Sequence, residues 1–328
     1  MADDKEHKTA FVDKYLRKGL ETGLAELEQE AKPGNMDTEA GYELPGETDE
    51  RISELLRDIS PLRKVANQVK IGNANYRRLV NTDGTASGWS SERQKDGKKE
   101  TFTEIVPPLG ELYANPAATQ AMLDDAFFNV EEWLAEELAQ EFGVKESSSF
   151  INGDGCNKPK GLLTYETSID DDAKRPFGEL QYLPTGVSGD FPVSDPVDIL
   201  IDLIYSLRPV YRAGASFLMN TNLVAEIRNY KDRHDNLVFK SAPAIGLPDT
   251  ILNYPVVEIE EMPDKAKDSF SIAFGNFQRG YIITDRLGTR LLRDPFSNKP
   301  FVHFYTTKRV GGGVVNSEAI KLLKFSAQ

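Results

Sequence analysis

The sequence is poor in the residues that build catalytic and metal centres. Its 328 residues include one cysteine, Cys156, and three histidines, His7, His234 and His303. A single cysteine cannot form an intrachain disulfide, so a secreted scaffold held by disulfides is excluded and a reducing compartment fits. This inventory is also a poor supply of zinc ligands, and we predict no metal and no cofactor.

The chain also lacks long apolar runs and an excess of basic residues. No stretch approaches the roughly 18 apolar residues of a membrane-spanning helix, and the charged N-terminus lacks the apolar core of a signal peptide, so we expect no membrane association. The formal net charge of -13 argues against tight wrapping of nucleic acid by the whole surface. Hydrophobic residues at 39% and charged residues at 28% are near the globular average, so the chain should fold.

The first part of the chain reads as an arm followed by a helix. Residues 1–49 are charged and interrupted by glycine, which is typical of an extended arm. Three apolar residues of the arm share one helical face: Phe11, Tyr15 and Leu16. The next stretch, within 50–69, has apolar residues at helical spacing, with Thr48 or Asp49 as the predicted N-cap and Pro61 as the stop. This helix should lead into a hairpin.

Residues 70–108 contain short β-prone runs separated by Asp83-Gly84 and Asp96-Gly97, dipeptides that favour tight hairpin turns. The pattern predicts a long, protruding hairpin. Its tip has no apolar residue to pack on its own subunit, so we expect it to contact a neighbour. The predicted tip residues are Lys95, Asp96, Gly97, Lys98 and Lys99.

The strongest helical signal follows Asn129. This residue and Glu132 form a capping-box-like N-x-x-E pattern, which predicts Asn129 as the N-cap. The expected apolar stripe consists of Val130, Trp133, Leu134, Leu138 and Phe142. A helix of this length spans about 30 Å and is long enough to serve as a spine.

The run "NGDGCNKPKG" after this helix has three possible interpretations. As a calcium loop it supplies one carboxylate, Asp154, where several oxygen ligands are needed. As a phosphate cradle it lacks the G-x-x-x-x-G-K-[ST] spacing. The favoured interpretation is a structural turn by which the chain leaves the spine helix. The residues of this turn are Gly153, Asp154, Gly155, Pro159 and Gly161.

No pattern of residues indicates an enzyme. A hydrolase using Asp154 or Cys156 would need a partnered histidine or further acids. His303 lies in the alternating run "FVHFY", which is more typical of a packed or rim histidine than of a ligand. The run "RVGGGVV" offers backbone amides to an anion, but a glycine turn between a long strand and a return strand explains it without a ligand.

Residues 195–294 have the alternating pattern of an α/β lobe. Pro196 begins a helical pattern, and the strand-like runs "SFLMN", "YPVVEIE", "SFSIAFG" and "GYIITD" follow it. A Pro-, Gly- and Asp-rich connection before Asp195 suggests a crossing between domains.

The order of these elements resembles a tailed-phage major capsid protein of the Hong Kong 97 fold. The resemblance is carried by "FINGDGCNKPKGLL", by "YPVV" and by "FGNFQRGYIITDRLG", and it spans nearly the whole chain. The details "SGWSSE" and "GDGCNKPKGLLTY" are similar to capsid proteins of gene transfer agents. In this family the Gly-Asp-Gly run carries the chain off the spine helix.

The resemblance implies an α+β fold with an N-terminal arm, an extended hairpin loop, a peripheral domain that contains the spine helix, and an axial α/β domain. The expected peripheral domain comprises 109–194 and 295–328, and the axial domain 195–294. Such subunits form hexamers and pentamers of an icosahedral shell around double-stranded DNA. The shell assembles in the cytoplasm of a bacterial host and becomes the virion capsid.

The resemblance also implies partners, and two alternative functions are weighed against it. The expected partners are other copies of the chain, a portal, and decoration or scaffolding proteins, with DNA enclosed without sequence-specific binding. A scaffolding segment is expected to be absent, cleaved or separate. The rival of the same fold is an encapsulin-like compartment, against which the Gly-Asp-Gly run and the long arm argue. The more distant alternative is a cytosolic hydrolase that uses Asp154 or Cys156.

The family's namesake joins a hairpin-loop lysine to an asparagine of a neighbour, with a glutamate promoting the reaction. Here Asn298 lies where the acceptor is expected, but Thr306, Thr307 and Lys308 occupy the stretch expected to hold the glutamate. Threonine cannot act as that base. His303 could do so in principle, but alternation along its strand does not ensure that it faces the lysine. We therefore predict shells without covalent links between subunits.

Overall fold

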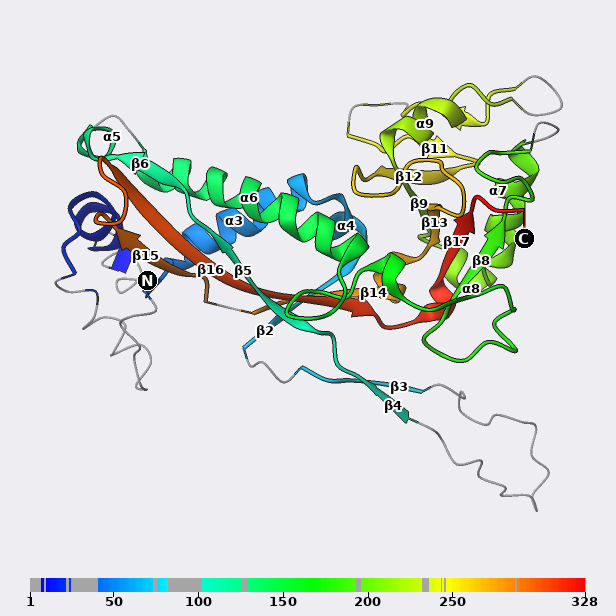
Figure 1. Ribbon diagram of the computed structural model, residues 1–328, viewed down its shortest axis with the longest axis horizontal. Coiled ribbons are helices and arrows are strands. Elements are labelled where there is room, and N and C mark those ends of the chain that lie inside the picture. The colour runs from blue at the N-terminus through cyan, green and yellow to red at the C-terminus, as the bar shows by residue number, and fades with distance from the viewer. Residues whose placement is uncertain are drawn as a thin grey trace, which may run out of the picture.

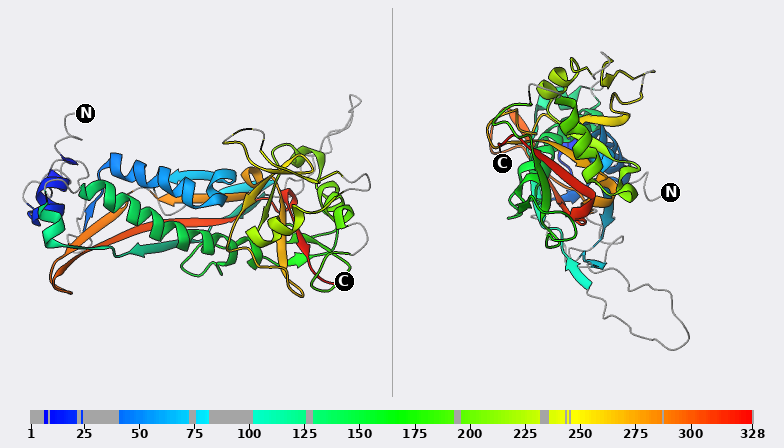
Figure 2. Two further views of the ribbon diagram at one scale, coloured as in Figure 1. Left: turned by 90° about the horizontal axis from the view of Figure 1, so that it is seen from above. Right: turned by 90° about the vertical axis from the view of Figure 1, so that its right-hand side faces the viewer.

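The computed structural model describes residues 7–8, 10–21, 24, 41–72, 76–81, 102–125, 129–192, 196–231, 236–242, 244, 246–286 and 288–327. The molecule is elongated, with a helix-covered sheet at one end and a smaller α/β lobe, which holds the C-terminus, at the other (Figure 1; Figure 2).

Seven strands form the first sheet, which we call the long sheet. Its strand order is β1-β15-β16-β14-β2, and β5 and β6 also pair with β16. The central strand β16 (Phe301–Val314) runs along the long axis of the molecule (Figure 1). The remaining strands are β1 (Tyr42–Glu43), β2 (Asn67–Ile71), β5 (Leu109–Ala114), β6 (Ala117–Thr119), β14 (Tyr281–Arg286) and β15 (Arg290–Asp294).

Two helices pack against each other beside the long sheet. The spine helix α6 (Val130–Asn152) contacts α3 (Gly46–Ile59) so closely that a Cβ on Gly143 would lie 2.4 Å from Ile59 Cγ2. The predicted N-cap is confirmed, since Asn129 Oδ1 accepts a hydrogen bond from the Glu132 N–H at 3.3 Å. Of the predicted stripe, four residues are buried and Trp133 is partly buried. Short helices α4 (Pro61–Val65) and α5 (Gln120–Asp124) flank this pair.

The predicted N-cap of α3 is wrong. The helix begins at Gly46, after Pro45, so both predicted residues lie inside its first turns. Their side chains bond to other elements instead: Thr48 Oγ1 donates to Glu131 Oε1 at 2.9 Å, and Asp49 Oδ1 accepts from Thr289 Oγ1 at 2.6 Å. The side-chain oxygens that could have capped the helix locally therefore bond to other elements of the fold. The predicted stop is confirmed, because α3 ends at Ile59 and Pro61 begins α4.

The described part of the arm packs within its own chain. A helical segment, η1 (Ala10–Leu16), buries Phe11, Tyr15 and Leu16 in the core under the long sheet. Tyr15 Oη also accepts a hydrogen bond from the Arg293 N–H at 3.0 Å. The apolar residues of this segment are therefore buried in the core of their own chain.

Eight strands form the second sheet, which we call the lobe sheet, in the order β10-β11-β12-β9-β13-β17-β8-β7. These strands are β7 (Thr167–Ser168), β8 (Leu180–Pro184), β9 (Ser216–Met219), β10 (Phe239–Lys240), β11 (Thr250–Ile251), β12 (Tyr254–Glu258), β13 (Phe270–Gly275) and β17 (Ile320–Lys324). The accompanying helical segments are α7 (Pro196–Ser206), α8 (Pro209–Arg212), α9 (Thr221–Ile227), α10 (Phe277–Gly280), η3 (Leu162–Thr164) and η4 (Ser317–Ala319).

Apolar side chains on the two faces of the lobe sheet belong to different cores. On one face Phe217 and Phe274 pack with residues of α7 and α9. On the other, Leu218 and Leu322 join a cluster with Phe150 of the spine helix. The second cluster therefore connects the lobe to the long sheet.

The sheets do not coincide with the predicted domain ranges. Strands β14 and β15 fall within 195–294 but pair in the long sheet, whereas β8 and β17 fall outside that range and pair in the lobe sheet. The reason is the chain path, which crosses between the halves several times. The domain boundaries remain a proposal, and the pairings favour assigning each strand to the sheet that it joins.

The predicted glycine turn in the tail is wrong. Gly311, Gly312 and Gly313 lie inside β16, which continues through them to Val314. The following strand, β17, does not return along β16 but joins the lobe sheet. The glycines are needed for close packing, because a Cβ on Gly311 would lie 2.5 Å from Thr284 Oγ1.

The two strands at the base of the predicted hairpin are paired. Strands β3 (Arg78–Asn81) and β4 (Phe102–Ile105) run antiparallel, with Arg78 opposite Ile105, and project away from the rest of the molecule (Figure 1). The tip, Lys95 to Lys99, and both predicted turn dipeptides lie outside the described residues.

Candidate functional site

The spine helix ends in a turn formed by residues 153–161, which we call the exit turn. Asp154 and Lys160 form an isolated antiparallel bridge across it. Asp154 Oδ1 accepts a hydrogen bond from the Cys156 N–H at 2.9 Å, and Lys158 Nζ lies 3.3 Å from Asp154 Oδ2. The Cys156 amide, together with the Lys158 ammonium, lowers the pKa of Asp154 below its ordinary value. The carboxylate is thus engaged in closing the turn.

Glycine is required where the two sides of the exit turn touch. A Cβ on Gly153 would lie 2.2 Å from the carbonyl oxygen of Pro159, and a Cβ on Gly161 would lie 2.5 Å from the Gly153 nitrogen. Gly155 has a φ of +82°, in the left-handed region that favours glycine. The five residues predicted for this turn are therefore brought together in one compact structure.

The exit turn is attached to the long sheet by hydrogen bonds of the Lys160 backbone. The Lys160 N–H donates to the Gly312 carbonyl at 3.0 Å, and Tyr281 Oη donates to the Lys160 carbonyl at 2.9 Å. Close approach again excludes side chains, since a Cβ on Gly110 would lie 2.3 Å from the Asn157 carbonyl oxygen. The turn therefore fixes the end of the spine helix to β5 and β16.

A buried ion cluster lies beside the exit turn. Arg63 Nε donates to Glu146 Oε2 at 2.7 Å, and the Arg63 guanidinium donates two bonds to Asp285, at 2.7 and 2.8 Å. Lys308 Nζ lies 3.6 Å from Asp285 Oδ1 and 3.9 Å from Glu146 Oε1. Two cations and two anions from α4, α6, β14 and β16 thus balance each other inside the protein.

Two members of the cluster, Asp285 and Arg63, have shifted pKa values. Burial alone would raise the pKa of Asp285, but the neighbouring charges of Lys308 and Arg63 outweigh it and hold this pKa well below its ordinary value. Burial alone would lower the pKa of Arg63, yet Glu146 and Asp285 raise it. Asp285 and Arg63 are therefore both charged at neutral pH.

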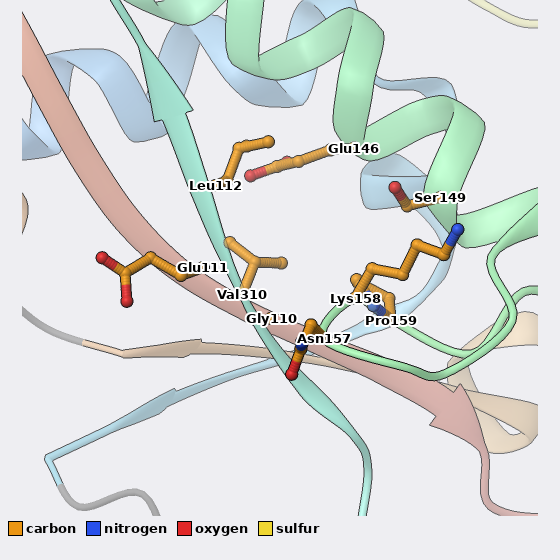
Figure 3. A pocket seen from close by; sticks show the side chains of 9 residues that line it. All are labelled: Gly110, Glu111, Leu112, Glu146, Ser149, Asn157, Lys158, Pro159 and Val310. Atoms are coloured by element: carbon orange, nitrogen blue, oxygen red, sulfur yellow. The ribbon is translucent and has the colours of Figure 1, made fainter.

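A cavity of about 30 Å³ connects the ion cluster to the exit turn (Figure 3). Its wall includes Glu146, Ser149, Asn157, Lys158 and Pro159, and β5 closes the other side. Glu146 Oε1 is buried and makes no hydrogen bond within the described structure. The cavity is too small for an organic substrate.

None of the other described sequence candidates belongs to the ion cluster. Cys156 is exposed on the exit turn. His303 is half-buried on β16, opposite Asp294 of β15. Asn298 is exposed in the connection between β15 and β16, and His234 lies outside the described residues. In the described part of the chain, no group of three or more His, Cys, Asp or Glu residues is placed to hold a metal ion.

Sequence reasoning missed the ion cluster. Glu146 follows Phe142 by four residues and precedes Phe150 by four, so it lies on the buried stripe of the spine helix. A charged residue on such a stripe signals a buried partner, but the sequence does not show that the partners are Arg63 and Asp285.

Residues 40–325 match the phage capsid family. The chain belongs to this family. It is similar to a solved structure described as the capsid of a native gene transfer agent particle, with 41% identity, coverage of 82% of this chain and 90% of that chain, and a TM-score of 0.71. The capsid of an empty gene transfer agent particle matches at 41% identity, 82% and 90% coverage, and a TM-score of 0.69.

A more distant solved structure is the SrpI encapsulin of Synechococcus elongatus PCC 7942. It matches at 15% identity, with 82% and 88% coverage and a TM-score of 0.53, and this likeness concerns the fold alone. A search of the curated proteins found no match.

The chain is a capsid protein of the phage or gene transfer agent type, and the predicted α+β Hong Kong 97 fold is confirmed. It is a structural protein of a shell. The helices of the described residues include none long and apolar enough to cross a membrane.

Proposed function

We propose that this capsid protein assembles into hexamers and pentamers of an icosahedral shell that encloses double-stranded DNA. The observation that carries the proposal is the 41% identity to a gene transfer agent capsid across 82% of the chain. The elongated shape supports it, because a long, thin subunit offers a large surface to its neighbours relative to its core.

The exit turn and the ion cluster have an architectural role in this proposal. They fix the spine helix to β5 and β16, so that the whole helix-and-sheet half moves as one body during assembly. The predicted tip residues, Lys95 to Lys99, supply a contact to the neighbouring subunit. Further partners are a portal and decoration or scaffolding proteins, and the shell forms in the cytoplasm of a bacterial host.

Electron microscopy of the purified protein tests assembly. We expect closed shells or capsomers, and light scattering across protein and salt concentrations should show large particles. A compact monomer under every condition would contradict the proposal. Deleting residues 75–102 should abolish shells while circular dichroism stays close to that of the full chain, because the exit turn, the long sheet and the lobe sheet lie outside the deletion.

The enclosed cargo distinguishes the proposal from an encapsulin-like compartment. Shells formed in a bacterial host that carries the remaining particle genes should contain nuclease-protected DNA. Shells that contain a protein cargo and no DNA would favour the compartment instead. Because the net charge is -13, we expect binding of free DNA to be weak and to disappear with salt.

We further propose that the shell has no covalent links between subunits. Thr306 is buried and Lys308 belongs to the ion cluster, so neither supplies a free base on β16. Boiled and reduced shells should give one monomer band on a denaturing gel. A ladder of multimers would overturn this part of the proposal.

A further inference from the structure

The lobe sheet has two edges far apart in the molecule. Strand β7 forms one edge and β10 the other, with six strands between them. At about 4.8 Å per strand, the edges lie roughly 34 Å apart. The strands next to them, β8 and β11, lie at opposite sides of the lobe (Figure 1). Each edge presents backbone groups to which another chain can pair.

The β7 edge carries more acidic than basic side chains, although Lys174 is also exposed beside Asp171. Glu166, Asp170 and Asp171 are exposed there, whereas Asp172 turns inward to Lys321. An apolar side chain stands among them, since Ile169 is 55% exposed. The combination of an exposed isoleucine with three carboxylates is typical of the polar rim and apolar centre of a protein interface.

The β10 edge is basic. Lys240 is exposed on β10 itself, and Arg228 and Lys231 are exposed at the end of α9 beside it. The Arg228 guanidinium lies over the Phe239 ring, 5.0 Å from its centroid. Apolar side chains are exposed here too, because Leu237 is 54% and Leu247 55% exposed.

These edges complement each other in charge and in apolar surface. One copy cannot bring them together, because they are separated by the whole width of its own sheet. We propose that the β7 edge of one subunit docks on the β10 edge of the next subunit. Such a head-to-tail contact uses two different surfaces and closes into a ring when the rotation between copies fits. The inference rests on the proposed function and adds the contact that joins adjacent lobes.

Engineered cysteines test the contact directly. In a Cys156→Ser background, Ile169→Cys and Leu247→Cys place one thiol at each edge. After mild oxidation of assembled particles by diamide, the double variant should give a ladder of multimers on a non-reducing denaturing gel, and the ladder should collapse on reduction. Because the two edges differ, particles of either single variant should give only the monomer band on this gel. Particles co-assembled from the two single variants should give cross-linked dimers and no larger species.

A charge exchange gives a second test. Asp170→Lys and Lys240→Glu should each lower the yield of particles at least tenfold, and the two together should restore it, because the charges are then swapped. The matched control is Lys267→Glu, an exposed lysine of the lobe outside both edges, which should leave the yield within twofold of that of the natural chain.

The outcomes separate the two proposals. If the natural chain never assembles, the proposed function fails. If it assembles but the double cysteine variant gives no ladder and the single charge reversals assemble normally, the edge contact fails while the proposed function stands. A single cysteine variant that dimerises by itself would indicate a symmetric contact and would also overturn the inference.

Discussion

The two halves of the molecule are held together by different means. The lobe sheet packs under α7 and α9 through a large set of buried aliphatic and aromatic side chains. The spine helix and the long sheet also share an apolar core. At the end nearer the lobe they are also joined by four paired charges, three of them buried, and by glycines in close backbone contact. Apolar packing tolerates small shifts, whereas paired charges and backbone contacts require one geometry. The spine end should therefore be the less adaptable region.

The largest effect is expected from removing one charge of the cluster. Arg63→Met leaves Glu146 and Asp285 facing Lys308 alone, and breaking a buried pair in this way costs about 3–5 kcal/mol. Chemical denaturation of the unassembled protein should show this loss in the free energy of unfolding. The control is Arg309→Met, whose partner Glu111 lies 3.2 Å away with both side chains about half exposed, and which should cost about 0–1 kcal/mol. Equal losses would contradict the proposed role of the ion cluster in holding this end of the spine helix.

Acid should weaken the same cluster by a smaller amount, because protonation removes one charge but leaves the side chains in place. The pKa of Asp285 is lower in the folded protein than its ordinary value of about 3.9. Its contribution to stability is therefore complete above about pH 4 and is lost as the pH falls toward the lower, native pKa. The free energy of unfolding, measured from pH 7 to pH 2, should fall more steeply below pH 4 in the natural chain than in Asp285→Asn. Parallel profiles would show that Asp285 is not the group responsible.

The sequence predicts the elements of both halves better than the contacts that join them. Asn129 and Pro61 mark helix ends through local chemistry, and the structure confirms both. Thr48 and Gly311–Gly313 were misread because distant groups decide their role: Glu131 binds Thr48, and Thr284 and Pro108 crowd Gly311. Within the cluster, the bonded pair Arg63 and Asp285 is separated by 222 positions in the chain, and no local pattern carries that information.

The exit turn should respond to a single methyl group. Gly161→Ala places a Cβ 2.5 Å from the Gly153 nitrogen and from the Ile151 carbonyl oxygen, both backbone atoms that cannot move aside without shifting the helix end. We expect a loss of about 1–3 kcal/mol in the free energy of unfolding. Gly46→Ala is the matched control, because nothing lies within 4 Å of a Cβ there and the residue is the first of α3. A stable Gly161→Ala protein would mean that the turn is less tightly constrained than its geometry indicates.

The smallest effect is expected at the other end of the spine helix. Asn129 is a local cap: its Oδ1 accepts from the Glu132 N–H, and its Nδ2 donates to Glu132 Oε2 at 3.0 Å. Asn129→Ala should therefore cost about 1 kcal/mol and increase hydrogen exchange in the first turn alone. The cap of α9 provides the comparison, because Asn220 also donates to the carbonyls of Glu260 and Met262, each at 3.1 Å. Asn220→Ala should cost more and speed exchange in both α9 and residues 259–262. If Asn129→Ala instead increased hydrogen exchange in the exit turn, the two ends of the spine helix would be coupled. The whole helix, and not only its exit turn, would then behave as one rigid unit.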